Sequence, residues 1–309
     1  MMKIFLNRSC PICQSKSHSK PFIKTKKRAE NLTFNSLVSY WNGFFKEKII
    51  FSYVRCNACG LLFCPKFFTN QQLKNLYGQM PPNMDEVPKN ALSKTQYGYF
   101  KALKNLSNLR GGYLEIGPDI GLFTEHCVRE GYFDDYWLFE PNKAVKNDLK
   151  RAVNGRKAKI IHEMTNFSAI PNNHIDVVII IHVMDHLLDP VGTLSALRKK
   201  LKNNGRILIV THDEASLLRK IFNWKWPAFC LQHPQIYNLK TTKELLRVAG
   251  FDVLEQHKTV NYFKLGFLFK HLLWAIGLKF IKTPRIFDIT IGLKLGNILT
   301  IASPSQRKN

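Results

Sequence analysis

Acidic residues are scarce in this sequence. The 309 residues include 22 Asp and Glu against 46 Lys and Arg, so the formal net charge is +24. Residues 1–66 hold 12 basic against 2 acidic residues (+10), and residues 256–309 hold 9 against 1 (+8). Basic ends of this kind attract polyanions or anionic lipid surfaces. The alternative interpretation is that lysine serves here only to keep the chain soluble.

Long hydrophobic runs are also lacking. The most apolar stretch, residues 262–281, is interrupted by four basic or ionisable side chains that make a membrane-spanning helix costly: Lys264, Lys270, His271 and Lys279. We expect an amphipathic helix over residues 262–281 that caps an active site or, alternatively, makes peripheral contact with a membrane surface. Residues 1–7 show no signal-peptide pattern. We therefore expect no transmembrane span and a cytoplasmic location.

Neither an internal repeat nor a low-complexity tract is present, and a hydrophobic content of 45% permits a sizeable core. From about residue 106 onward, short apolar runs alternate with helical stretches, which is the pattern of βαβ units. We expect strands over residues 112–116, 136–139, 158–161, 175–181, 206–211, 251–256 and 297–302. We expect helices over residues 120–130, from 142 onward, over 191–201 with Gly205 as a stop signal, and over 241–249. The fold class predicted is α/β.

A glycine turn joins the first of these strands to the first helix. The segment 115–121 reads Glu-Ile-Gly-Pro-Asp-Ile-Gly, and glycines are needed where backbone comes close to a ligand. The N-terminus of the helix supplies free N–H donors. Glu140 ends the next strand, where a carboxylate can accept both hydroxyls of a ribose. Together these features predict a nucleoside-like ligand over the carboxyl ends of the strands.

Two other interpretations of this turn exist. A dinucleotide site would show Gly-x-Gly-x-x-Gly, whereas this chain has the spacing Gly-x-x-x-Gly. Glu115, just before the turn, suits a ligand with a positive charge nearby, such as a sulfonium or its amino group. The plainest alternative is an ordinary tight turn with Glu140 on the surface.

These segments resemble the class I S-adenosylmethionine-dependent methyltransferases over residues 106–256. The resemblance implies a Rossmann-like, mostly parallel sheet of seven strands and S-adenosylmethionine as the cofactor. Two residues depart from the family pattern: Asp119 replaces a usual glycine, and Asp185 stands where Glu is common. Asp tolerates a left-handed backbone better than most residues. The further segments that carry the resemblance are residues 139–142, 174–178, 182–190 and 201–209.

The same resemblance implies roles for particular residues. The turn would contact the methionine part of the cofactor through Glu115, Gly117, Asp119 and Gly121. Glu140 would hold the ribose. Glu163, or its neighbour Met164, would lie near the adenine, and His182 would border the reacting methyl group.

Seven cysteines are present, and this odd number argues for a reducing compartment. Four of them form two C-x-x-C pairs that predict a closed, structural Zn²⁺ site: Cys10, Cys13, Cys56 and Cys59. An iron–sulfur cluster and unligated thiols are the alternatives. We expect residues 1–66 to form a small zinc-ribbon-like module, residues 67–105 a helical connector, and residues 106–309 the methyltransferase domain. The module resembles those preceding some sugar-modifying bacterial methyltransferases.

His233 lies in a segment resembling the methyltransferase region where a histidine commonly faces the substrate. An imidazole is well suited to act as a general base, so His233 and His182 are the predicted catalytic residues. His186 and Tyr237 are further candidates, and an ordinary packing role is the alternative for His233.

Three functions are compatible with the sequence. Methylation of a small-molecule or glycan acceptor, such as a sugar or sugar nucleotide, follows from the resemblance of the zinc module. The basic ends motivate an RNA or DNA methyltransferase. That alternative is not favoured, because residues 182–185 lack an Asn/Asp-Pro-Pro-aromatic motif. The third function is that of a catalytically inactive, zinc-containing scaffold protein, in which Asp119 marks the loss of the cofactor site.

Overall fold

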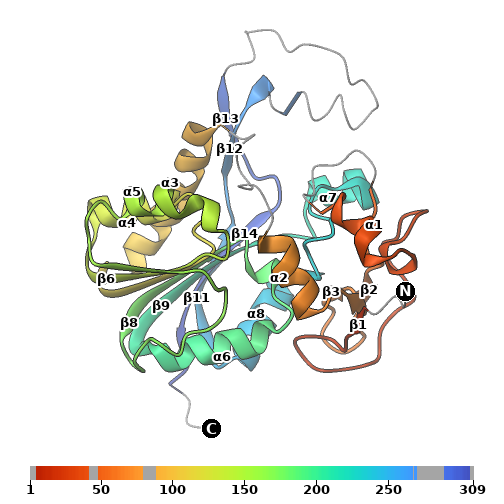
Figure 1. Ribbon diagram of the computed structural model, residues 1–309, viewed down its shortest axis with the longest axis horizontal. Coiled ribbons are helices and arrows are strands. Elements are labelled where there is room, and N and C mark those ends of the chain that lie inside the picture. Colours follow the sequence, from red (N-terminus) through yellow and green to blue (C-terminus); the bar gives the residue numbers. More distant parts are fainter. Residues whose placement is uncertain (1–4, 42–47, 79–87, 267, 270–288, 307–309) are drawn as a thin grey trace.

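The computed structural model describes residues 5–41, 48–78, 88–266, 268–269 and 289–306 (Figure 1). The helices are α1 (Phe34–Val38), α2 (Asn70–Gly78), α3 (Lys89–Leu106), α4 (Leu122–Glu130), α5 (Lys146–Ala152), α6 (Pro190–Lys200), α7 (Leu217–Phe222) and α8 (Leu239–Val248). The long strands are β5 (Arg110–Ile116), β6 (Tyr132–Phe139), β7 (Ala158–Ile161), β8 (Ile175–Ile181), β9 (Leu201–His212), β11 (Phe251–Lys258) and β14 (Asn297–Pro304). The short strands are β1 (Leu6–Asn7), β2 (Val54–Arg55), β3 (Leu62–Phe63), β4 (Lys66–Phe67), β10 (Gln235–Ile236), β12 (Asn261–Lys264) and β13 (Thr290–Leu293).

A seven-stranded sheet forms the centre of the molecule, in the order β11-β14-β9-β8-β5-β6-β7. The five strands from β9 to β7 run parallel, and β14 pairs antiparallel with both β9 and β11. The central strand β8 consists of Ile and Val apart from Asp176, and its residues 177–180 are fully buried, as a strand covered on both faces requires. The predicted α/β class and mostly parallel sheet of seven strands are confirmed.

Helices cover both faces of the sheet (Figure 1). On one face lie α3, α4 and α5, whose side chains Phe100, Phe123 and Leu149 share one buried core with the sheet. On the other face lie α6 and α8, with Leu194 and Leu245 in a second core. Such burial contributes about 1.5–3 kcal/mol for each large apolar side chain. Helix α3, which falls within the predicted connector, is therefore part of the layer over the sheet.

Some predicted bounds differ from the structure. Helix α4 begins at Leu122, because Gly121 adopts a left-handed backbone and serves as its N-cap. Gly205 lies inside β9 and does not stop α6, which already ends at Lys200. The chain turns directly into β9 there because Leu201, already extended, pairs with Ile175 of β8.

The predicted cap helix over residues 262–281 begins as a strand. Residues 261–264 form β12, which pairs antiparallel with β13. Its aromatic residues favour extended backbone, and the backbone N–H of Tyr262 donates to Thr95 Oγ1 at 2.7 Å. Residues 270–281, with the expected membrane contact, lie outside the described residues. Within the part of the chain that the structure describes, no helix combines the length and apolar character that crossing a bilayer takes.

The N-terminal segment forms a compact unit against the sheet domain. Strand β1 pairs with β4, and β2 and β3 form a three-stranded sheet with β10 from a distant part of the chain. The aromatic side chains Trp41, Phe51 and Phe68 pack edge to face around the centre of this unit. The same buried core includes Trp226 and Phe229. The N-terminal module is therefore continuous with the segment that precedes β10.

Candidate functional site

The glycine turn after β5 has the backbone that its sequence predicts. Gly117 and Gly121 adopt positive φ angles of +66° and +83°. A Cβ atom at Gly117 would lie 2.5 Å from Val183 Cγ2, and one at Gly121 would lie 2.5 Å from Ala152 Cβ. Asp119 also has a positive φ, +50°, so the replacement of the usual glycine preserves the left-handed backbone. The turn thus presents backbone closely to whatever lies over it.

Glu140 lies beside this turn, at the end of β6. Its side chain is buried, and its two oxygens accept hydrogen bonds from the backbone N–H groups of Asn142 (2.8 Å) and Asp119 (3.1 Å). A carboxylate oxygen has a second lone pair, so each oxygen can still accept a ligand hydroxyl. Burial raises the pKa of Glu140 to about 7, although the two backbone bonds oppose this. The surface position considered for Glu140 is therefore wrong.

Glu115 lies beneath the turn and is also buried. Its carboxylate accepts hydrogen bonds from the hydroxyls of Tyr113 (2.6 Å) and Thr124 (2.5 Å). Burial raises the pKa of Glu115 to about 7, again against the effect of its hydrogen bonds. Two buried carboxyl groups therefore flank the turn, and a cationic ligand would favour their ionised forms.

Glu163, predicted near the adenine, is exposed in the segment after β7. The structure ties a different residue of that segment to the site. His162 Nδ1 lies 3.0 Å from the backbone carbonyl oxygen of Glu140. The role of Glu163 stays a prediction.

Four histidines meet beyond the carboxyl ends of β8 and β9. The ring centroids are 4.7 Å apart for His182 and His212, 4.9 Å for His212 and His233, and 4.6 Å for His186 and His233. Burial lowers the pKa of both His182 and His186 well below the usual range. We call these four residues the histidine cluster. It contains both predicted catalytic residues.

The two predicted catalytic residues are held by different contacts. His182 has a positive φ of +54°, and its Nε2 lies 3.2 Å from Asn297 Nδ2. His233 Nδ1 lies 2.6 Å from the carbonyl oxygen of Ala228. Because a carbonyl oxygen only accepts, Nδ1 of His233 carries a proton and Nε2 is the nitrogen that can take up another.

Cys230 lies next to His233, with 3.5 Å between its Sγ and the histidine Nδ1. Burial alone would lower the pKa of His233. The negative charges of Cys230 and Asp185 outweigh burial and raise the pKa to about 9. Cys230 is buried, and it is also an electrostatic partner of the cluster.

His212 was not predicted from the sequence. It ends β9, and its Nδ1 lies 2.9 Å from Oδ2 of Asp185, which is completely buried. The backbone N–H of His212 also donates to this oxygen, at 3.1 Å. The sequence offers one signal for this residue: a histidine stands at the end of β9. This strand pairs with β8, which leads directly to His182. Only the sheet order shows that the two histidines meet.

The N-terminal module holds the segment that carries His233. The hydroxyl of Tyr53 donates a hydrogen bond to the carbonyl oxygen of His233 at 2.5 Å. In the other direction, Nε2 of Gln232 donates to the carbonyl oxygen of Trp41 at 3.0 Å. The ammonium group of Lys48 donates to two further carbonyl oxygens of this segment, those of Trp226 and Phe229. The module therefore fixes one wall of the histidine cluster.

The four predicted cysteine ligands come together. The Sγ atoms of Cys10 and Cys59, and those of Cys13 and Cys56, are each 3.5 Å apart, and all four lie within 4.8 Å of one another. In a tetrahedral site with metal–sulfur bonds of about 2.3 Å, the sulfur atoms are roughly 3.8 Å apart. No disulfide joins these thiols. The group therefore fits a tetrahedral metal ion.

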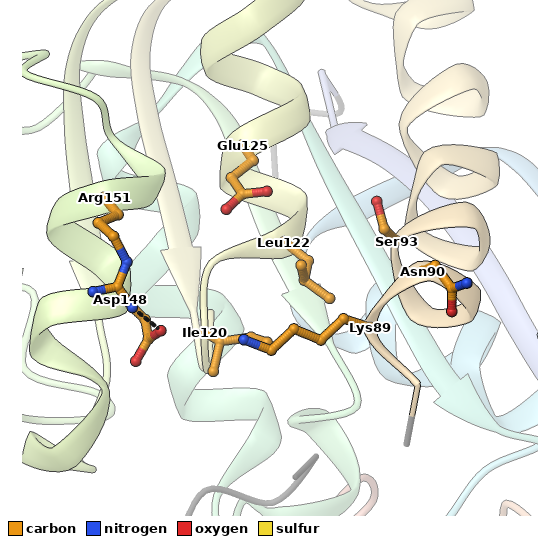
Figure 2. A pocket seen from close by; sticks show the side chains of 8 residues that line it. All are labelled: Lys89, Asn90, Ser93, Ile120, Leu122, Glu125, Asp148 and Arg151. Atoms are coloured by element: carbon orange, nitrogen blue, oxygen red, sulfur yellow. Dashed lines mark hydrogen bonds and ion pairs between the residues drawn. The ribbon is translucent and has the colours of Figure 1, made fainter. Parts of the chain in front are cut away.

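A cavity of about 350 Å³ lies beside the glycine turn, between α3, α4 and α5. Figure 2 shows the side chains that line it: Lys89, Asn90, Ser93, Ile120, Leu122, Glu125, Asp148 and Arg151. None of the predicted cofactor residues contributes to its lining. The cavity therefore borders the turn through Ile120, and neither Glu115 nor Glu140 lines it.

Comparison with known proteins identifies the fold and the family. Residues 92–256 match the methyltransferase domain family, which is more than half of the chain. The chain belongs to this family. It is an S-adenosylmethionine-dependent methyltransferase of the class I type, with the Rossmann-like sheet. No curated protein matches the sequence.

One solved structure supports the fold. One similar chain comes from the complex between the Haloferax volcanii Trm112 methyltransferase activator and a putative methyltransferase. It is 12% identical, with a TM-score of 0.52 over 72% of this chain and 94% of that chain. A putative methyltransferase from Bacillus halodurans is also 12% identical, with a TM-score of 0.48 over 68% of this chain and 100% of that chain.

The affinity for S-adenosylmethionine should depend on pH through the two buried carboxyl groups. Glu115 and Glu140 have pKa values of about 7, and a cationic ligand lowers these values, so binding releases protons. Affinity should therefore be highest above about pH 7 and fall below it, by up to about tenfold per pH unit for each group. Calorimetry in buffers of different ionisation enthalpy measures both quantities. An affinity that does not change between about pH 6 and 8 would contradict the prediction.

Proposed function

We propose that this enzyme transfers the methyl group of S-adenosylmethionine to a small-molecule or glycan acceptor, such as a sugar or sugar nucleotide. The acceptor lies against the histidine cluster, and His233 takes up its proton. The observation that carries this proposal is the cluster itself, with four histidine rings gathered beside the strand ends where the cofactor turn lies.

The cofactor lies over the glycine turn in this proposal. Gly117 and Gly121 give its methionine part close access to backbone, with Glu115 and Asp119 beside it. Glu140 accepts the ribose hydroxyls through its free lone pairs, and Glu163 lies near the adenine. Val183, packed directly against Gly117, connects the turn to the cluster. This contact supports the placement of His182, its chain neighbour, at the edge of the reacting methyl group.

The reaction is a displacement at the methyl carbon. The nucleophilic atom of the acceptor forms a bond to that carbon, and the carbon–sulfur bond breaks with its electron pair remaining on sulfur. The products are S-adenosylhomocysteine, the methylated acceptor and a proton, which His233 Nε2 receives. Holding acceptor and methyl group in line supplies much of the rate in such a transfer.

We further propose that Cys10, Cys13, Cys56 and Cys59 bind a structural Zn²⁺. Four thiolates leave no coordination position open, so this ion contributes to folding and not to the chemistry. The thiols support a reducing, cytoplasmic location.

The acceptor class is tested with methyl-labelled cofactor. The full-length protein is incubated with sugar nucleotides and glycan precursors in one series, and with RNA and DNA in another. Mass spectrometry then locates the label. Labelled sugar or glycan supports the proposal. Label found only in nucleic acid would establish the RNA or DNA methyltransferase alternative, and no binding of the cofactor would favour the scaffold.

The role of His233 predicts a particular pH profile. Its pKa of about 9 means that the imidazole is a base only at high pH, so kcat/KM should rise until about pH 9. The variant Cys230→Ser removes the main cause of the raised pKa, and the rise should move to lower pH. Cys127→Ser, another buried cysteine position, should leave the profile in place. Superimposable profiles for the wild type and Cys230→Ser would exclude His233 as the base.

A further inference from the structure

The carboxylate of Asp185 lacks the partners that a buried charge needs. The side chain is 0% exposed, and its Oδ1 has no hydrogen-bond partner among the described residues. Within the same described part, His212 is its one ion-pair partner. A buried carboxylate is normally paired with a cation or bound to a metal ion, because desolvation of an isolated charge costs several kcal/mol.

A second buried atom in the same place is also unpartnered. His182 Nδ1 has no hydrogen-bond partner among the described residues, although its Nε2 contacts Asn297. Buried polar atoms are nearly always hydrogen-bonded, so each of these two unpartnered atoms needs an explanation. An ion bound between them satisfies both atoms at once.

The donor atoms have the spacing that one ion requires. One ligand atom each from His182, Asp185 and His212 lies within 4.8 Å of the others. Oδ2 of Asp185 and Nδ1 of His212 are already 2.9 Å apart, and the unpartnered Oδ1 belongs to the same carboxylate. Around an ion with bonds of about 2.0–2.2 Å, neighbouring ligand atoms lie roughly 3 Å apart.

We propose that His182, Asp185 and His212 bind one divalent transition-metal ion, which holds a hydroxyl group of the acceptor beside the methyl donor. This inference rests on the proposed function. Two imidazoles and one carboxylate on one side of an ion leave its other positions open for a substrate, and this donor set suits Mn²⁺, Fe²⁺, Co²⁺ or Zn²⁺ better than Mg²⁺ or Ca²⁺.

The ion supplies a chemical function that the histidines alone do not. A bound metal lowers the pKa of a coordinated hydroxyl, as it does for water, so the oxygen becomes nucleophilic near neutral pH. The released proton passes to solvent, because His233, which lies next to His212, already carries its own proton near neutral pH. Asn297 acts as a positioning residue. When the metal ion binds Nδ1 of His182, Nε2 of the same ring carries the proton. The side-chain amide of Asn297 then turns its oxygen toward this N–H group and accepts a hydrogen bond from it.

Mn²⁺ is the probe that separates this site from the cysteine site, because it prefers nitrogen and oxygen ligands to thiolates. The full-length protein, loaded with one equivalent of Zn²⁺ per chain so that only the thiolate site is filled, is titrated with Mn²⁺, and free Mn²⁺ is followed by electron paramagnetic resonance. We expect one Mn²⁺ to bind per chain. Asp185→Asn and His212→Ala should each weaken this binding by at least about tenfold.

A matched control is available on the surface. His257 Nδ1 lies 2.9 Å from Glu255 Oε1, the same separation as in the Asp185–His212 pair, but both side chains are largely exposed. His257→Ala should leave Mn²⁺ binding unchanged. Binding of S-adenosylhomocysteine, measured by calorimetry, shows that each variant is folded.

The outcomes distinguish this inference from the proposed function. No saturable Mn²⁺ binding at millimolar concentration, or binding that survives both substitutions, would overturn the metal site while cofactor binding and methyl transfer persist. Conversely, Mn²⁺ binding with the predicted loss in both variants supports the site even if no sugar or glycan is methylated.

Discussion

The substitution Glu140→Ala is expected to weaken the binding of S-adenosylmethionine by roughly 10²- to 10⁴-fold. Hydrogen bonds to a charged group contribute about 1.5–3 kcal/mol each, and the ribose offers two hydroxyls. The site is prepared for them, because Asn142 and Asp119 already hold both oxygens of Glu140 in place. Calorimetric titration of the purified protein measures the change.

Controls separate loss of the ribose contact from damage to the turn. Glu140→Gln keeps the shape and one acceptor oxygen, so an intermediate loss of affinity is expected. Glu130→Ala removes a partly exposed carboxylate paired with Lys104 at the far end of α4, and it should not change the affinity. An affinity unchanged by Glu140→Ala would refute the ribose role. A large fall in the thermal midpoint of both Glu140 variants would assign the effect to the turn.

The fold could be predicted well because its signals are local. Strand β8 consists of β-branched residues apart from Asp176, and the glycines of the turn occur where positive φ angles are needed. These patterns lie within a few residues of one another. Helix limits were less predictable, since residues at an end such as Leu201 take their conformation from the neighbouring strand.

The histidine cluster was predictable only in part. His182 and His233 each stand out in their own segments, but His212 becomes significant only when β9 lies beside β8 in the sheet. Asp185 was interpreted as a variant of a usual Glu, and its contact with His212 depends on the same tertiary arrangement. Residues brought together by parallel strands leave no trace in local sequence.

The extent of the N-terminal module could not be predicted for a similar reason. The two C-x-x-C pairs predicted a unit that ends near residue 66, but the aromatic core around Phe51 and Phe68 is completed by Trp226 and Phe229. Strand β10, from that same later segment, completes its sheet. The N-terminal module and the segment carrying His233 therefore share one core, whereas the four cysteines pack against the core of the central sheet.

Loss of the ion at the cysteine group should consequently abolish methyl transfer without preventing cofactor binding. Structural zinc contributes about 10–16 kcal/mol in zinc-finger peptides, far more than a single side-chain contact. Without it, the module loses the rigidity with which Tyr53 and Lys48 hold the backbone around His233. Glu140 and the glycine turn lie on the sheet and keep their geometry.

The substitution Cys59→Ser tests this argument, with Cys59→His as the matched control. Histidine restores a zinc ligand in a Cys₃His set, and Cys59 is partly exposed, so the larger ring has room. We expect Cys59→Ser to lose zinc, to show faster amide hydrogen exchange in residues 226–237 and to have a much lower kcat. Cys59→His should keep its zinc, the slow exchange of these residues and most of the wild-type kcat. A loss of cofactor affinity in Cys59→Ser as large as its loss of kcat would show that the module does not act through the segment that carries His233. Unchanged amide hydrogen exchange around His233 would show the same.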